Sequence, residues 1–137
     1  MQIIKKYQNE VYTMALSLTC NAQKSKIAAV KAFEKILKSY HSDSPETKIK
    51  LYKELLKNIG IFTINKNDLD RKGIINSVKH RLGLFDKKVF VLKYEFNCGL
   101  KDIVYILDSS CEKVKKSLVK STERLAKILE DMKNEVQ

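Results

Sequence analysis

Basic side chains recur at helical spacing near the carboxyl end of the sequence. Lys113, Lys116, Lys120 and Arg124 follow one another at steps of three and four residues, which places them near one side of a helix. No acidic residue interrupts them before Glu123. Helix surfaces that stabilise themselves by ion pairs alternate in sign, so a face of one sign indicates a negatively charged partner such as the phosphates of duplex DNA.

The overall charge agrees with a polyanionic partner. The chain of 137 residues has 27 Lys and Arg against 16 Asp and Glu, which gives a formal net charge of +11. A lysine-rich composition with a merely solvated lysine face is the alternative explanation. Short hydroxyl donors beside the cations can also reach phosphates or base edges. The candidate DNA-contacting residues are Ser110, Lys113, Lys115, Lys116, Ser117, Lys120 and Arg124.

No group of residues suggests a catalytic or metal centre. His41 and His80 have no cysteine or carboxylate pair near them at the spacing of a metal site or a catalytic triad. Cys20, Cys98 and Cys111 show no Cys-x-x-Cys spacing. A glycine-rich phosphate loop is also absent. We therefore expect no enzyme activity, no metal and no cofactor.

The elements that position the basic residues are predicted to be helices. The sequence has 4 glycines, 1 proline and 44% hydrophobic residues, a composition that favours a packed helical protein. Apolar residues recur at helical steps over 7–18, 27–40 and 49–59, and the second stretch has Ile27, Val30, Phe33 and Ile36 on its predicted inner face. Asn21 is a candidate N-cap for that stretch. Residues 86–96 are also predicted to be helical, although Val-Phe-Val-Leu within them has strand propensity.

The predicted fold is all-α, with two small helical domains at residues 1–60 and 70–137. A short linker at 61–69 separates them, because Gly60 indicates a helix end and an Asn/Asp-rich stretch indicates a turn. The sequence has no apolar run long enough to span a bilayer and no export signal, so the expected location is the cytoplasm. No segment combines exposed aromatics with lysines as a membrane-surface helix does, and we expect no membrane partner.

The basic residues follow a helix-turn-helix pattern. Leu100, Ile103 and Leu107 predict a short helix, and Asp108 suits a left-handed turn position. Ser109 with an acidic residue three positions later predicts a capping box at the start of a second helix. The apolar seam of that second helix is predicted at Val114, Leu118, Leu125 and Leu129. Short helix, tight turn and second helix is the plan with which many proteins place a helix in the major groove.

Three stretches resemble parts of two regions of one known family. "VFVLKYEFNCGLKDIVYILDSSCEKVKKSLVKSTERLAKIL", residues 89–129, resembles the C-terminal promoter-recognition region (region four) of bacterial sigma factors, especially the small extracytoplasmic-function (ECF) type. "YQNEVYTMALSLTCNAQKSKIAAVKAF", residues 7–33, resembles the start of region two of the same family, and "LLKNI" at 55–59 resembles a later part of that region. The turn glycine of the family is replaced by Asp108.

The resemblance implies a transcription initiation protein. Its partners would be promoter duplex DNA, the β′ and β subunits of the RNA polymerase core, and an anti-sigma protein. The positions that match the polymerase-contacting helix of region two are Val30, Lys31, Phe33 and Glu34, and the candidates for contact with single-stranded DNA are Tyr40 and Tyr52.

Departures from the family pattern support an alternative function. The family has acidic residues and a glutamine where this chain has Ile27, Val30 and Lys31, and the chain has no tryptophan for the strand-opening segment. A degenerate sigma-like regulator, which binds DNA or another protein but does not open promoters, is therefore the second hypothesis.

Overall fold

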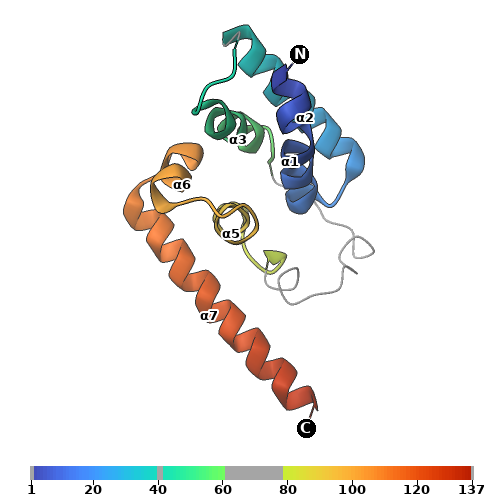
Figure 1. Ribbon diagram of the computed structural model, residues 1–137. Helices are drawn as coiled ribbons and strands as arrows, with labels where there is room; N and C mark the ends of the chain where they lie inside the picture. The colour runs from blue at the N-terminus through green and yellow to red at the C-terminus, as the bar shows by residue number, and fades with distance from the viewer. Residues whose placement is uncertain (1, 40–41, 61–78, 137) are drawn as a thin grey trace.

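The computed structural model describes residues 2–39, 42–60 and 79–136. Within these ranges every regular element is helical, which confirms the predicted all-α fold. The elements are α1 (Gln2–Thr19), α2 (Ala22–Ser39), α3 (Thr47–Lys57), α5 (Leu84–Phe90), the π-helical turn η2 (Val91–Glu95), α6 (Leu100–Leu107) and α7 (Cys111–Val136). The Val-Phe-Val-Leu stretch is helical, as predicted. Figure 1 shows α7 as a long rod whose C-terminal turns extend away from the other helices.

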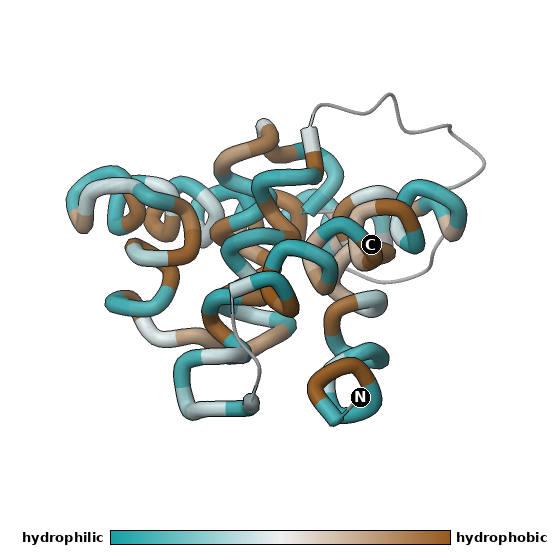
Figure 2. Tube along the Cα trace, turned by 90° about the horizontal axis from the view of Figure 1, so that it is seen from above, coloured by the Kyte–Doolittle hydropathy of each residue, from teal (hydrophilic) through white to brown (hydrophobic). Residues whose placement is uncertain are grey.

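The first three helices pack through apolar stripes at helical spacing. Val11 and Met14 of α1, with Leu51 and Leu55 of α3, are completely buried. Hydrophobic and hydrophilic residues alternate along the helices (Figure 2), so each helix has an inner and an outer side. Asn21 precedes α2 and caps it as expected, because its side-chain oxygen accepts a hydrogen bond of 2.9 Å from the backbone N–H of residue 24.

The prediction of which residues form the inner face of α2 was partly wrong. Ile27 and Val30 are 48% and 55% exposed, whereas the small residues Ala28 and Ala32 are buried. The buried stripe of α2 follows the steps of Ala28, Ala32 and Ile36, and the larger side chains at 27 and 30 lie outside it. Alanine permits close approach of two helices, and a prediction weighted toward large apolar side chains overlooked it.

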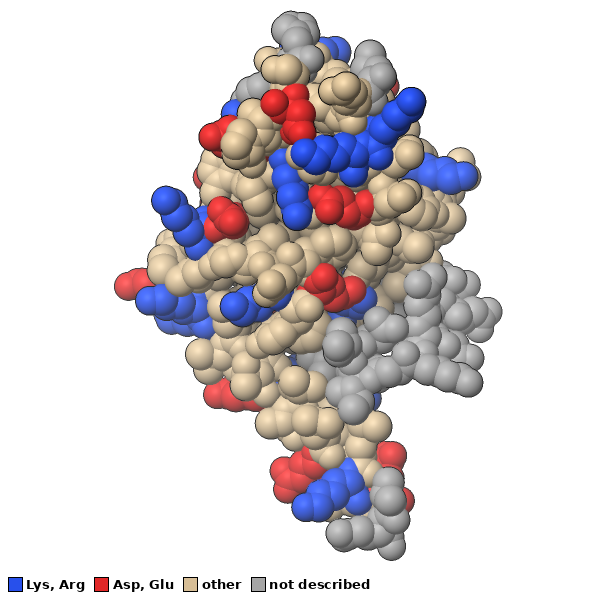
Figure 3. Space-filling view, in the orientation of Figure 1, with Lys and Arg blue, Asp and Glu red and all other residues tan. Residues whose placement is uncertain are grey.

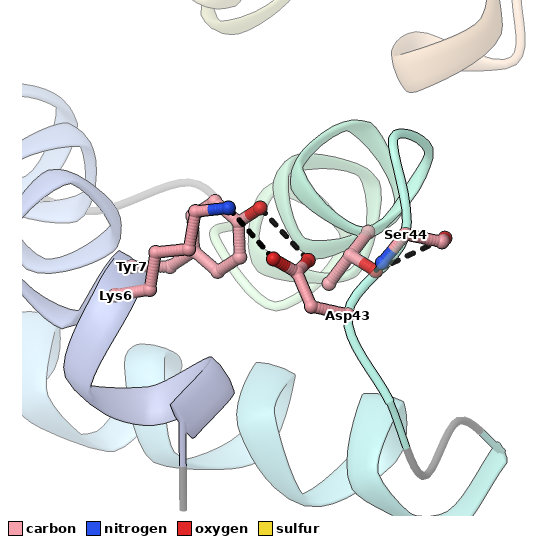
Figure 4. A network of polar contacts seen from close by, with 5 residues as sticks. Lys6, Tyr7, Asp43 and Ser44 are labelled. Atoms are coloured by element: carbon pink, nitrogen blue, oxygen red, sulfur yellow. Dashed lines mark hydrogen bonds and ion pairs between the residues drawn. The ribbon is translucent and has the colours of Figure 1, made fainter.

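A polar network joins the segment before α3 to α1 (Figure 4). The carboxylate of Asp43 accepts hydrogen bonds from the Lys6 ammonium at 2.7 Å and from the Tyr7 hydroxyl at 2.9 Å. The hydrogen bond from Lys6 is the main cause that holds the pKa of Asp43 below its usual value. The backbone N–H of Ser44 donates to the hydroxyl of Thr47, the first residue of α3, at 2.9 Å. These contacts fix the entry to α3 relative to α1.

Residues from both predicted domains contribute to one hydrophobic core. It contains Val11 and Leu55 from the N-terminal part together with Leu92, Ile103 and Val114 from the C-terminal part, all buried. The helix α3 packs against α6, and α1 packs against η2. The predicted linker at 61–69 lies outside the described residues. These contacts show that the described parts on either side of the predicted linker share one core.

Polar contacts add to this interface. The ammonium of Lys88 on α5 donates to the backbone carbonyl of Leu56, near the end of α3, at 2.8 Å. The buried ammonium of Lys79 lies 2.7 Å from the Ser17 hydroxyl of α1 and 3.2 Å from the Glu95 carboxylate. The Ser17 hydroxyl also donates to that carboxylate at 2.7 Å. Through Leu56 and Ser17, these contacts tie α3 and α1 to the C-terminal part of the chain.

Candidate nucleic-acid interface

The predicted helix-turn-helix is present as α6, a short turn and α7. Asp108 has φ 49° and ψ 53°, the left-handed conformation expected for the turn. Its backbone N–H donates to the carbonyl of Tyr105 at 3.2 Å, and the N–H of Ser109 donates to the carbonyl of Val104 at 3.1 Å. These two bonds end α6 and set the direction in which α7 begins.

The cap of α7 differs from the prediction by one residue. The helix begins at Cys111, and the Ser110 hydroxyl accepts a hydrogen bond of 3.1 Å from the backbone N–H of Lys113. Ser110 therefore occupies the cap position that the sequence pattern gave to Ser109. The residue three positions after this cap is Lys113, whose ammonium cannot accept a hydrogen bond and so cannot complete a capping box.

One side of α7 is buried, and its members differ in part from the prediction. Val114 is buried as predicted, while Leu118 and Leu125 are partly buried beside the two core clusters. Leu129 was predicted in the seam but is 44% exposed, and Ile128 is buried in its place. The seam of a helix drifts around its axis over several turns, because 3.6 residues per turn do not match a fixed four-residue step.

Ser117 does not lie on the exposed face with the lysines, contrary to expectation. Its side chain is 3% exposed, and its hydroxyl oxygen has no hydrogen-bond partner among the described residues. Ser117 follows Val114 at a step of three, which places it in the buried seam. A buried hydroxyl cannot reach a phosphate, so Ser117 is removed from the candidate contacts. Ser110 is exposed at the start of the helix.

The predicted basic residues of α7 are all exposed. Lys113, Lys116, Lys120 and Arg124 share one side, and we call this set the basic stripe. Lys115 is two residues from Lys113 and therefore lies on a different side of the helix. Sequence reasoning missed Lys127, which is exposed and continues the stripe by a further step of three. The signal for it was the same spacing that identified the other members.

Two members of the basic stripe interact with α5. The ammonium of Lys120 lies 3.1 Å from the Asp86 carboxylate, although the lysine side chain stays 62% exposed. The ammonium of Lys113 lies 4.3 Å from the centre of the Phe85 ring. Lys116 and Arg124 make no ion pair with any residue that the structure describes. These two cations are the members of the stripe best placed to meet phosphates.

Positive charge is not confined to α7. Figure 3 shows Lys and Arg side chains spread over the visible face of the helical body, with Asp and Glu between them. An exposed lysine is therefore a weak indication of function by itself. The spacing of the basic stripe and its place on the second helix of a helix-turn-helix distinguish it from this background.

A shallow apolar groove lies between α1 and α2. It has a volume of about 500 Å³, and its lining includes Lys26 and the larger apolar or aromatic residues Ile4, Tyr12, Val30 and Phe33. Of the four residues predicted to contact polymerase, Val30 and Phe33 therefore meet in one groove, where Phe33 is buried and Val30 is exposed. The other two, Lys31 and Glu34, are exposed on α2 but do not line the groove.

The burial of the aromatic residues does not support the predicted contacts with single-stranded DNA. Tyr52 is 1% exposed, and its burial, reinforced by the nearby Glu10 carboxylate, raises the pKa of its hydroxyl. A ring in this position cannot stack on a base, so the prediction for Tyr52 was wrong. Tyr40 lies outside the described residues. Unlike Tyr52, Tyr105 on α6 is 44% exposed. The sequence analysis did not name Tyr105 as a candidate contact residue.

Residues 2–39, 42–60 and 79–136 contain no candidate metal site and no candidate membrane span. Within them, no three or more His, Cys, Asp or Glu side chains are grouped closely enough to hold a metal ion. None of the helices in the same ranges has the length and apolarity needed to cross a bilayer.

Two comparisons with known proteins were negative and assign no family to this chain. A scan against protein-family models found no match to this chain, and a search of curated proteins also found none. The resemblance to sigma factors therefore stays a prediction from the sequence.

Proposed function

We propose that this chain is a sigma-like transcription initiation protein that binds promoter duplex DNA through α7 and the RNA polymerase core through α1 and α2. The observation that carries the proposal is the basic stripe, exposed along the second helix of a helix-turn-helix. In proteins of this plan the second helix enters the major groove, and cations at steps of three and four meet the phosphates on either side. A cytoplasmic location is part of the proposal.

The packing of α7 supports this use. The helix is held from one side by α5 and α6, through Val114 and the partly buried Leu118 and Leu125. No other helix covers the opposite side of α7 among the described residues, since Glu112 and Val119 are exposed there. A rigid helix with a fixed buried side presents its cations at defined positions, and this reduces the entropy lost when DNA binds.

The groove between α1 and α2 supports polymerase docking. Ile27 and Val30 are exposed apolar side chains on α2, and Phe33 and Tyr12 line the groove beside Val30. Apolar side chains exposed next to a groove are typical of a surface that receives a partner helix. The resemblance of residues 7–33 to region two makes the polymerase clamp the partner that we propose.

Duplex binding tests the role of the basic stripe. Replacing Lys116 and Arg124 together by alanine should weaken binding to a short DNA duplex and reduce the slope of log K against log salt by about 2, because each lost phosphate contact contributes about 0.9. The matched control replaces Lys38 and Lys133, two exposed lysines outside the stripe, and removes the same net charge. Fluorescence anisotropy at several salt concentrations measures both quantities. Equal effects of the two double variants would refute a specific role for the stripe.

A second candidate function is a degenerate regulator that does not open promoters. The burial of Tyr52 favours it, because promoter opening requires side chains that hold unstacked bases. Reconstitution with the polymerase core separates the two candidates. Transcripts that start at defined positions support the initiation protein, whereas duplex binding without retention of the core supports the regulator.

A further inference from the structure

A groove separate from α7 and from the α1–α2 groove lies where α2, α3 and α6 meet. It consists of two adjoining cavities of about 230 Å³ and 540 Å³, and Lys50 and Tyr105 line both of them. We call the two together the α3–α6 groove. The larger cavity has the volume of a typical small-molecule site, about 300 to 1,000 Å³.

The smaller cavity is strongly basic. Lys35 of α2 and Lys50, Lys53 and Lys57 of α3 line it, with Glu54 as the carboxylate among them. The Lys57 ammonium lies 3.6 Å from the Glu54 carboxylate, so one positive charge is partly balanced. The remaining charge is positive and comes from two helices. Such a cavity favours an anion with several oxygen atoms, such as a phosphate.

The larger cavity has an apolar character. Pro45 and Ile49 line it beside the ring of Tyr105, which is 44% exposed. The Lys53 ammonium, which belongs to the basic cavity, lies 4.3 Å from the centre of that ring. A flat, exposed aromatic ring next to aliphatic side chains suits the stacking of a nucleobase.

Two carboxylates make the ends of the groove different. Glu46 and Asp102 line the larger cavity but not the smaller one. Lys50 and Lys101 also line the larger cavity, so positive and negative charges balance there, whereas positive charge is in excess in the smaller cavity. The two carboxylates can accept hydrogen bonds from the amino groups of a base. The groove is therefore suited to a ligand with a phosphate at one end and a planar, hydrogen-bonding group at the other.

We propose that the α3–α6 groove binds a nucleoside phosphate, with its phosphate beside Lys35, Lys53 and Lys57 and its base against Tyr105. The same chemistry is found in a free nucleotide and in the end of a single nucleic-acid strand. The proposal does not rest on duplex binding by α7, because the basic stripe contributes no residue to this groove.

Titration of the ¹⁵N-labelled full-length chain, followed by NMR, tests the proposal. The probes are ADP, a short oligodeoxyadenylate with the same base, and inorganic pyrophosphate. ADP or the oligonucleotide should shift the amide signals of Ile49 and Tyr105, and the probe that binds more tightly identifies the source of the ligand. Pyrophosphate lacks a base and should bind at least about tenfold more weakly, since base stacking is lost.

Two variants and a matched control locate the site. Lys35→Ala should weaken binding about tenfold, because a charged hydrogen bond to phosphate is lost. Tyr105→Ala should weaken binding of ADP but not of pyrophosphate. Lys38→Ala removes the same charge from the same helix, but Lys38 does not line the groove, so this variant should bind ADP about as tightly as the wild type.

The outcomes are distinct from those of the duplex experiment. No binding of ADP or oligonucleotide at millimolar concentration would overturn the proposal. Equal affinity for pyrophosphate and ADP would show a plain anion site and would also overturn it, as would equal effects of Lys35→Ala and Lys38→Ala. Because Lys35 is an exposed residue, its variant keeps the test valid even if Tyr105→Ala disturbs the fold.

Discussion

Replacing Ile103 by alanine tests whether the two predicted domains behave as one folding unit. Ile103 lies on α6, is 0% exposed and belongs to the core that also contains Val11 and Leu55 of the N-terminal helices. The substitution leaves a cavity in the core to which both parts of the chain contribute. We expect it to destabilise both parts together.

The expected loss can be estimated from the atoms removed. Each buried carbon contributes about 0.8 kcal/mol, and the cavity left by a large-to-small change adds to the cost, so the free energy of unfolding should fall by about 3 kcal/mol. For a chain of this size each kcal/mol lowers the melting temperature by about 3 to 4 °C, so Ile103→Ala should melt about 10 °C below the wild type.

Native-state hydrogen exchange with NMR detection measures where this loss is felt. In a shared core, amides of α1 such as Val11 and Met14 should lose as much protection as amides of α6. The control is Val119→Ala on α7, because Val119 is 58% exposed and its truncation should change stability by less than about 0.5 kcal/mol. If α6 lost protection while α1 kept it, the two parts would unfold independently and a single folding unit would be refuted.

Three further changes test local contacts. Ser110→Ala removes the cap of α7 and should cost about 1 kcal/mol in chemical denaturation, and an equal cost for Ser109→Ala would contradict the assigned cap. The pKa of Asp43 is depressed in the folded state, so its contacts stabilise the protein at neutral pH and are lost as the pH falls through the folded-state pKa. Asp43→Asn should therefore lower the melting temperature at neutral pH. It should also reduce the drop in melting temperature between neutral and acidic pH, and an unchanged drop would contradict this reasoning. Glu95→Ala leaves the buried ammonium of Lys79 without its carboxylate and should lower the free energy of unfolding by about 3 kcal/mol. A loss below about 1 kcal/mol in the same denaturation assay would show that the ion pair contributes little to stability.

Local signals in the sequence predicted local structure well. Asn21 caps α2 and Asp108 adopts the left-handed turn, because each depends on the residue itself and on its close neighbours in the chain. The buried positions of α1 between residues 7 and 18 were also predicted, since helical periodicity specifies them, whereas the buried Ile3 and Thr19 were not. The all-α fold follows from the same kind of information.

Features that depend on packing between elements were predicted less well. Ser117 and Tyr52 are polar or amphipathic residues that were predicted to contact DNA, but both are buried. The alanines of α2 pack inward while Ile27 and Val30 remain exposed. Periodicity identifies an apolar side but does not show which neighbour covers it. For the same reason, periodicity did not predict that residues on either side of the predicted linker share a core.

The proposed basic stripe and the α3–α6 groove depend differently on the shared core. The groove requires α2 and α3 to stay next to α6, so a nucleotide bound there would stabilise that arrangement by about 2.7 kcal/mol at a hundred times its dissociation constant. The basic stripe is exposed while the core is intact, so duplex binding needs no separation of the two parts. Saturating ADP should therefore leave duplex affinity unchanged in the anisotropy assay, but it should oppose any partner that binds only after α3 and α6 separate. A duplex affinity that fell several-fold with ADP in the wild type but not in Lys35→Ala would show that DNA binding requires the core to open, against the arrangement proposed for α7. An equal fall in both would show that ADP competes directly at the basic stripe.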